Sequence, residues 1–386
     1  MSRAIDDEPD GSAGALTLPA RREAGRLRVA IFSDALPERN GAGAYYEDLA
    51  VQLGPRLAAL RLFRPAVKRR LLGLALPLPG DSTQKLITPN VMRIGRELKG
   101  LRPHLIVAVT PGPFGLLGLY HARRRGCGFL TAFHTHFEGL AELYGGTVAV
   151  RLAQGYLERV NHLLCRNSDA VLVNNDALRA TVERLGARRV DVMGTPLARA
   201  FLDTPPLPPP PRLRQVLFAG RLAPEKNLSE ILEASRALPG LRFVMSGDGP
   251  LRRELEKAAA QLPNLRLTGW LSRDALRAEM DASSLLLLPS HMETFGTVAL
   301  ESMARGRPAL VAESAGIHHW PILGEALFPL AAGDTVTAAL VELAALPAEV
   351  WTTKAAAARK AAEALNQHTL MQWLDFVERY GRGPRD

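Results

Sequence analysis

Two glutamates stand at a spacing that suits nucleotide binding. Glu293 and Glu301 lie eight residues apart in the segment Leu285–Ser314, and between them Gly296 opens a predicted helix. The first turn of a helix carries unpaired backbone N–H groups and the positive end of the helix dipole, which together bind phosphate. Glu301, farther into the helix, can direct its carboxylate to vicinal hydroxyls such as those of a ribose. Acidic residues are also common in ordinary helix starts, so the pair alone does not establish a site.

Two cations follow another apolar strand. Arg221 and Lys226 stand just after Gly220, where a strand ends, and two cations at the carboxyl end of a strand suit a diphosphate. Gly247 lies in a turn after the next strand. Gly269–Leu271 leave a third strand, where backbone amides can face a planar base. Such cations are more often ordinary surface residues, so they indicate a site only in combination with the glycines and the two glutamates.

The elements that must position these residues alternate between strand and helix in both halves of the chain. Their strands are continuous apolar runs, such as Leu105–Thr110, which are typical of parallel sheets buried on both faces. The proline-rich stretch Phe201–Gln215 separates two such series. We therefore predict an α/β fold of two Rossmann-like domains that face each other across a cleft. The predicted divisions are a disordered tail at 1–25, a first domain at 26–203, a hinge at 204–214, a second domain at 215–365 and a C-terminal helix at 366–386 that crosses back to the first domain.

Composition narrows the class of protein. The chain has 386 residues, of which 47% are hydrophobic and 23% charged, as in globular proteins of two domains. The two cysteines, Cys127 and Cys165, form no CxxC or Cys/His cluster, which indicates a reducing compartment and argues against structural zinc. We expect no signal peptide and no membrane-spanning run. The formal net charge is +9, and the first 200 residues account for it with 28 Lys and Arg against 18 Asp and Glu.

Four ordered motifs in the second half carry a family resemblance. They are GRLAPEKN, SGDGP, GWLSRDAL and ETFGTVALESMARGRPALV, all within residues 215–316. They resemble the nucleotide-sugar-binding domain of the family 4 retaining glycosyltransferases of the GT-B fold. In the first half, Phe133–Gly145 is similar to a segment of members that glycosylate diacylglycerol, phosphatidylinositol or related mannose acceptors. Asn40–Gly43 resembles the glycine loop of the same family.

The resemblance implies a role for each matching residue. Arg221 and Lys226 would hold the diphosphate, Glu293 the hydroxyls of the donor sugar, and His134 would lie at the reacting centre; these four form the implied catalytic set. The implied donor-binding set is Gly41, Gly43, Gly220, Gly247, Gly269, Leu271, Phe295, Gly296, Thr297 and Glu301. The resemblance implies no metal and no cofactor beyond the donor, a nucleotide diphosphate sugar of the UDP or GDP type. A histidine after an apolar strand is more often structural, so His134 depends most on the resemblance.

A basic stretch of the first half bears on the acceptor. Five cations precede the apolar run Leu71–Leu78 and together suit an anionic membrane surface: Arg61, Arg64, Lys68, Arg69 and Arg70. We then expect a lipid acceptor such as diacylglycerol and a cytoplasmic protein at the inner face of a membrane. An ordinary connection with solvated cations fits the stretch equally well. Glu313–Trp320 departs from the family pattern, so a soluble or polysaccharide acceptor, a nucleotide-sugar epimerase and a non-catalytic relative stay open.

Overall fold

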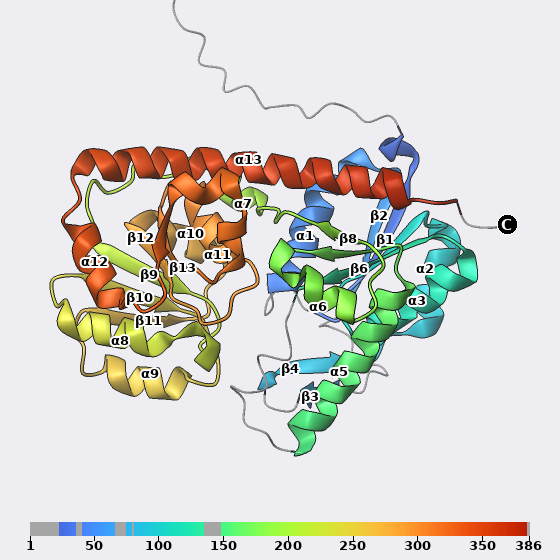
Figure 1. The fold of residues 1–386 in the computed structure, drawn as a ribbon, viewed down its shortest axis with the longest axis horizontal. Helices are drawn as coiled ribbons and strands as arrows, with labels where there is room; N and C mark the ends of the chain where they lie inside the picture. The colour runs from blue at the N-terminus through green and yellow to red at the C-terminus, as the bar shows by residue number, and fades with distance from the viewer. Residues whose placement is uncertain (1–22, 36–40, 66–74, 79–80, 135–147, 384–386) are drawn as a thin grey trace, which may run out of the picture.

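The computed structural model describes residues 23–35, 41–65, 75–78, 81–134 and 148–383. Two six-stranded parallel sheets form the centres of two domains (Figure 1). The first sheet, in spatial order, consists of β2 (Ala59–Phe63), β1 (Arg28–Phe32), β5 (Leu105–Ala108), β6 (Gly128–Phe133), β7 (Ala170–Val173) and β8 (Val190–Val192). The second consists of β11 (Leu265–Gly269), β10 (Arg242–Ser246), β9 (Gln215–Ala219), β12 (Leu285–Leu288), β13 (Ala309–Ala312) and β14 (Leu327–Leu330). The predicted α/β fold of two Rossmann-like domains is confirmed.

Helices cover both sheets. Those of the first domain are α1 (Gly41–Leu53), α2 (Val91–Leu101), α3 (Pro113–Arg125), α5 (Val148–Asn167) and α6 (Arg179–Arg184), and α7 (Arg199–Leu202) leads to the second domain. Those of the second are α8 (Leu228–Ala237), α9 (Arg252–Ala259), α10 (Arg273–Ala282), α11 (Thr297–Ala304) and α12 (Val336–Ala344). A small antiparallel pair, β3 (Ala75–Leu78) and β4 (Asp81–Ile87), stands apart from the sheets. The central strands are apolar and buried along their length, which is why their sequences are continuous hydrophobic runs.

The last helix joins the two domains. α13 (Ala348–Tyr380) has 33 residues and runs along both domains in Figure 1. It packs against α11 and the 3₁₀ helix η6 (Pro321–Ala326) of the second domain, and against α1 of the first. Trp373 donates a hydrogen bond from Nε1 to the Tyr45 hydroxyl at 2.8 Å. The division expected at residue 366 falls inside this helix, because buried apolar residues continue along it without a break.

The chain passes between the domains beside α13. The backbone N–H of Leu197 donates to Asn366 Oδ1 at 2.8 Å, and that of Gly194 donates to Gln372 Oε1 at 3.0 Å. A Cβ atom on Gly194 would lie 2.1 Å from Thr369 Oγ1, so only glycine allows this approach. The outgoing segment and the returning helix therefore cross between the domains side by side.

The proline-rich segment is fastened to the second domain. Arg305 and Arg307 follow α11 and have no exposed surface. Arg305 donates hydrogen bonds to the carbonyl oxygens of Phe201 at 3.1 Å and Pro205 at 3.0 Å. Arg307 donates to the carbonyl oxygen of Leu207 at 2.7 Å. Two guanidinium groups thus satisfy carbonyl groups of a segment that is too rich in proline to build a regular ladder.

Candidate active site

Three predicted glycines line the carboxyl edge of the second sheet. The N–H of Gly220, after β9, donates to Ser246 of β10 at 3.0 Å, and that of Gly247 donates to Gly269 of β11 at 2.9 Å. A Cβ atom on Gly247 would lie 1.8 Å from the carbonyl oxygen of Gly220. Gly269 has a φ of +71°, which turns the chain sharply toward Leu271. The edge is therefore bare backbone, which a ligand can approach closely.

The predicted cations lie on one loop of this edge. Lys226 Nζ lies 2.6 Å from Glu293 Oε2, and both side chains are largely buried. Arg221 forms an ion pair with Glu225 at 3.2 Å. The N–H of His291 donates to the carbonyl oxygen of Glu225 at 2.9 Å, which ties the Glu293 loop to the loop of the cations. The structure thus brings Arg221, Lys226 and Glu293 into one neighbourhood.

The start of α11 follows directly. Gly296 precedes its first residue, Thr297, with a φ of +104°, and no side chain caps this end of the helix. A Cβ atom on Gly296 would lie 3.1 Å from Leu288 and 3.6 Å from Cγ of Glu293. Phe295 is buried and anchors the turn. The uncapped N–H groups and the helix dipole therefore supply positive charge beside the Lys226–Glu293 pair.

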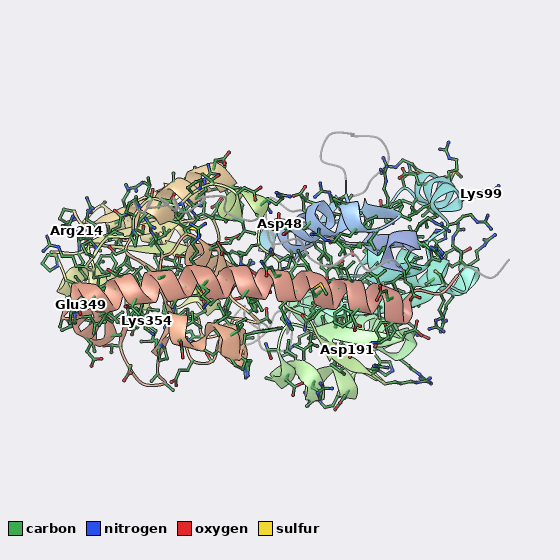
Figure 2. The ribbon with its side chains drawn as sticks, turned by 90° about the horizontal axis from the view of Figure 1, so that it is seen from above. Asp48, Lys99, Asp191, Arg214, Glu349 and Lys354 are labelled. Carbon is green, nitrogen blue, oxygen red and sulfur yellow. The ribbon has the colours of Figure 1, made fainter. Side chains whose placement is uncertain are left out.

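Glu301 lies where the two domains meet. Burial and the repulsion of Asp48 raise the pKa of Glu301 to about 8, and Arg273 opposes that shift. Arg273 of α10 binds Asp48 of α1 with two hydrogen bonds, at 2.5 and 2.9 Å. Figure 2, seen from above, places Asp48 near the middle of the molecule. Burial also raises the pKa of Asp48 to about 6, with Arg273 opposing. This three-residue cluster joins the domains across the predicted ribose position.

His134 directly follows β6 and is half-buried. Its Nε2 lies 2.9 Å from the Tyr46 hydroxyl, and the rings of Tyr45 and Tyr46 lie edge-on to it at 5.2 and 5.4 Å. Burial lowers the pKa of His134 to about 4, although the Asn174 side chain raises it. The imidazole is therefore neutral near pH 7 and offers one donor and one acceptor nitrogen.

The two glycines of the first domain lie differently from expectation. We expected Gly41 and Gly43 in a loop, but α1 already begins at Gly41. Both glycines therefore belong to the first turn of α1, because the helical hydrogen bonds start before the apolar pattern does. Asn40 lies outside the described residues.

The basic stretch is described only in part. Arg61 pairs with Glu97 at 3.1 Å and Arg64 with Glu47 at 3.0 Å, so both cations have acidic partners. The other three lie outside the described residues: Lys68, Arg69 and Arg70. A membrane surface through this stretch stays a prediction.

The segment that departs from the family pattern packs on the site. The N–H of Gly316 donates to the carbonyl oxygen of Glu293 at 3.0 Å, and a Cβ atom on Gly316 would lie 1.9 Å from the carbonyl oxygen of Thr294. His318 lies 3.1 Å from the carbonyl oxygen of Val311. The segment thus supports the Glu293 loop from behind.

Sequence reasoning missed a set of polar residues in the junction. Asn175 donates from Nδ2 to the carbonyl oxygen of Thr294 at 2.7 Å, and Trp320 donates to the carbonyl oxygen of Asn174 at 3.0 Å. Oδ1 of Asn175 and Oγ of Ser290 are buried with no hydrogen-bond partner among the described residues. Buried polar atoms left open in this way suit a ligand that completes them. Their position just after β7 and β12 is the one feature of the sequence that could have marked them as site residues.

Within the described part of the chain, no group of three or more His, Cys, Asp or Glu residues is arranged to hold a metal ion. None of the helices in that part combines the length and the hydropathy needed to cross a bilayer.

Comparisons with known proteins match both halves of the chain. The family model described as "Glycosyltransferase Family 4" matches residues 39–197, and the model "Glycosyl transferases group 1" matches residues 203–326. A GDP-mannose-dependent alpha-mannosyltransferase of Mycolicibacterium smegmatis is 32% identical over 242 residues, which are 62% of this chain and 63% of that protein. A GDP-mannose-dependent alpha-(1-6)-phosphatidylinositol dimannoside mannosyltransferase of Mycobacterium tuberculosis is 28% identical over 277 residues, 67% of this chain and 70% of that protein.

The fold is also similar to that of solved structures. Sucrose-phosphate synthase of Thermosynechococcus elongatus superposes with a TM-score of 0.70 over 92% of this chain and 99% of that chain, at 17% sequence identity. The two family models follow one another along the chain and together match most of it, from residue 39 to residue 326 apart from 198–202. The chain therefore belongs to the family 4 glycosyltransferases of the GT-B fold.

Proposed function

We propose that this glycosyltransferase is a retaining, metal-independent hexosyltransferase with a donor of the UDP-sugar or GDP-sugar type and no further cofactor. The observation that carries the proposal is the Lys226–Glu293 contact of 2.6 Å beside the uncapped start of α11. It combines a cation and a helix dipole, which suit a diphosphate, with a carboxylate that suits sugar hydroxyls. Glu301 holds the ribose, and the glycine edge of the sheet admits the base.

The proposed reaction needs charge stabilisation above all. The bond between the anomeric carbon and the diphosphate oxygen breaks, and its electron pair stays on the diphosphate. The acceptor oxygen forms the new bond on the same face, and its proton passes to the departing phosphate oxygen. Arg221, Lys226 and the first amides of α11 stabilise the charge that develops, which is where preorganised dipoles contribute most.

His134 has a positioning contact with the sugar in this proposal. A neutral imidazole cannot neutralise the diphosphate, but it can hydrogen-bond a sugar hydroxyl. Tyr46, 2.9 Å away, fixes which way the ring faces.

The acceptor is proposed to be the hydroxyl of a membrane lipid such as diacylglycerol, reached from the cytoplasmic face. One relative is named a phosphatidylinositol dimannoside mannosyltransferase, and the first half of this chain is strongly basic. Anionic headgroups attract such a surface. A soluble sugar or a polysaccharide is the competing acceptor.

The test begins with the full-length protein and a thermal-shift screen of UDP, GDP and ADP with and without EDTA. A nucleotide at 100 times its Kd adds ~2.7 kcal/mol of stability. We expect one nucleotide to stabilise the protein whether or not EDTA is present. The matching sugar donor is then incubated with diacylglycerol vesicles, and the anomeric configuration of the product is read by NMR.

Each outcome decides one part of the proposal. An inverted anomer would refute retention, and activity that EDTA abolishes would refute metal independence. Release of an epimerised donor sugar would favour an epimerase. A protein that no nucleotide stabilises would be a non-catalytic relative of the fold.

A further inference from the structure

A hollow of about 620 Å³ lies between α3 and α5 on the first domain. Its lining combines leucines, a tyrosine and arginines: Leu116, Leu119, Tyr120, Arg123, Arg124 and Leu163. The two helices pack against each other there, and α5 extends past the sheet in Figure 1. This hollow is separate from the glycine edge and from the Asp48–Arg273 contact.

Large apolar side chains are exposed at the hollow and along α5. Leu152 is 71% exposed, Tyr120 51%, Leu163 41% and Tyr156 39%. On α5 these positions are spaced by four and seven residues, so they share one face of the helix with Arg159. Three of these side chains follow one face of α5, and Tyr120 joins Leu163 at the hollow; a row of exposed apolar side chains indicates a binding partner, unlike scattered single residues. We call Leu152, Tyr156, Leu163 and Tyr120 the apolar patch.

The charge around the patch has one sign. α3 and α5 together carry six arginines and a single acid, Glu158. The arginines are Arg123, Arg124, Arg125, Arg151, Arg159 and Arg166. Arg124 Nη1 donates to the Tyr120 hydroxyl at 2.9 Å, so cation and aromatic ring are held together. Tyrosines and arginines beside exposed leucines match the boundary between headgroups and acyl chains of a bilayer.

We propose that the α3–α5 face binds an anionic phospholipid bilayer. The leucines and tyrosines of the apolar patch enter the headgroup region, and the arginines pair with lipid phosphates. This inference rests on the proposed lipid acceptor and deepens it, because it names the surface that brings the protein to that acceptor. Among the described residues it is a better candidate than Arg61 and Arg64, whose charges are paired with glutamates.

The test is sedimentation of the full-length protein with vesicles of phosphatidylcholine alone or mixed equally with phosphatidylglycerol. We expect binding to the mixed vesicles, weakened by salt, and little binding to neutral ones. The double variant Arg123→Glu/Arg124→Glu should bind at least about 25-fold more weakly, since each cation near an anionic surface is worth about fivefold, or ~1 kcal/mol. Its matched control, Arg236→Glu/Arg253→Glu, changes exposed arginines of the second domain and should bind as the unaltered protein does.

The apolar contribution is tested in the same way. Leu152→Ser/Leu163→Ser should reduce binding to the mixed vesicles by about tenfold or more, with less effect on its salt dependence. Val341→Ser/Ile322→Ser, which alters exposed residues 52% and 45% accessible on the second domain, is the control. Equal losses in the face variants and their controls would overturn the inference, and so would equal binding to neutral and anionic vesicles.

Two readouts separate this inference from the proposed function. Vesicle binding is measured without any donor, so a lipid that is never glycosylated refutes the lipid acceptor and leaves the bilayer surface standing. With a short-chain, monomeric diacylglycerol, the face variants should keep the turnover of the unaltered protein. Light scattering gives the molecular mass, and a dimer that dissociates in Leu152→Ser/Leu163→Ser would show a second copy of the chain as the occupant instead.

Discussion

The charge on Glu301 should make nucleotide binding depend on pH. With a pKa of about 8, the Glu301 carboxyl is roughly 90% protonated at pH 7. An ionised carboxylate accepts hydrogen bonds from both ribose hydroxyls, whereas the protonated form loses part of that capacity. Nucleotide affinity should therefore rise by up to about tenfold per pH unit below pH 8 and level off above it.

The Asp48→Asn variant is the decisive perturbation. It removes the charge that repels the Glu301 carboxylate, and it releases Arg273 to attract that carboxylate. Both effects lower the pKa of Glu301, by on the order of one unit, which corresponds to ~1.4 kcal/mol. The ionised fraction at pH 7 then rises from about one tenth to about one half, a gain of about fivefold in affinity. Arg273→Gln should move the pKa of Glu301 the opposite way.

The assay is calorimetric titration with whichever of UDP and GDP stabilises the protein, from pH 6 to pH 9. Asp48→Asn and Arg273→Gln both break the Asp48–Arg273 contact between the domains, so nucleotide affinity should change at every pH. The midpoint of the pH dependence still reports the pKa of Glu301. Glu301→Gln is the control, because it retains the titration of the nucleotide phosphates. A midpoint that stays in place or rises in Asp48→Asn would refute this reasoning, as would a Glu301→Gln variant with the unaltered pH profile.

Three further outcomes follow from the structure. Glu301→Gln should stabilise the ligand-free protein by about 3 kcal/mol at pH 7, because the raised pKa makes the folded state hold a proton that the unfolded state releases above about pH 4.5. Urea unfolding at pH 5 and pH 7 measures the free energy of unfolding of the variant and of the unaltered protein. An equal gain in stability at the two pH values would contradict the prediction. Lys226→Ala should lower kcat by about 10²–10³ with a small change in nucleotide Kd, read by steady-state kinetics, and an unchanged kcat would remove Lys226 from the diphosphate site. Arg305→Met removes the guanidinium that lies 2.7 Å from the largely buried Asp281 carboxylate, and it should destabilise the protein by about 3–5 kcal/mol in chemical unfolding. A loss of stability below about 1 kcal/mol would show that Arg305 does not hold the proline-rich segment.

Much of the fold could be predicted because each buried parallel strand can be recognised from its own residues. A run such as Leu285–Leu288 is apolar at every position, and its partners in the sheet need not be known. The same holds for Gly220, Gly247 and Gly269, since each stands at the carboxyl end of its own strand. The roles assigned to these glycines and to Glu293 remain predictions, whereas their common location is a finding.

The contacts between the domains could not be predicted from local sequence patterns. Asp48 and Arg273 are 225 residues apart, and neither stands out from the many charged helix residues of the chain. Asn174 and Asn175 look like ordinary residues at the end of a strand until the second domain is placed against them. The start of α1 at Gly41 was missed because glycine weakens a helix locally, so the apolar pattern that predicts a helix begins only after the glycines.

The path of α13 bears on how this family can exchange parts. A donor-binding domain moved into a relative needs two junctions, one near Gly194–Leu197 and one within α13. The second junction falls beside Asn366 and Thr369, which touch the first crossing directly. Recombinants cut at the proline-rich segment alone would place a foreign helix against Tyr45, whose hydroxyl accepts a hydrogen bond from Trp373 of α13 in this chain. Viable chimeras should therefore inherit α13 from about Asn366 onward together with the first domain, whichever relative supplies the nucleotide site.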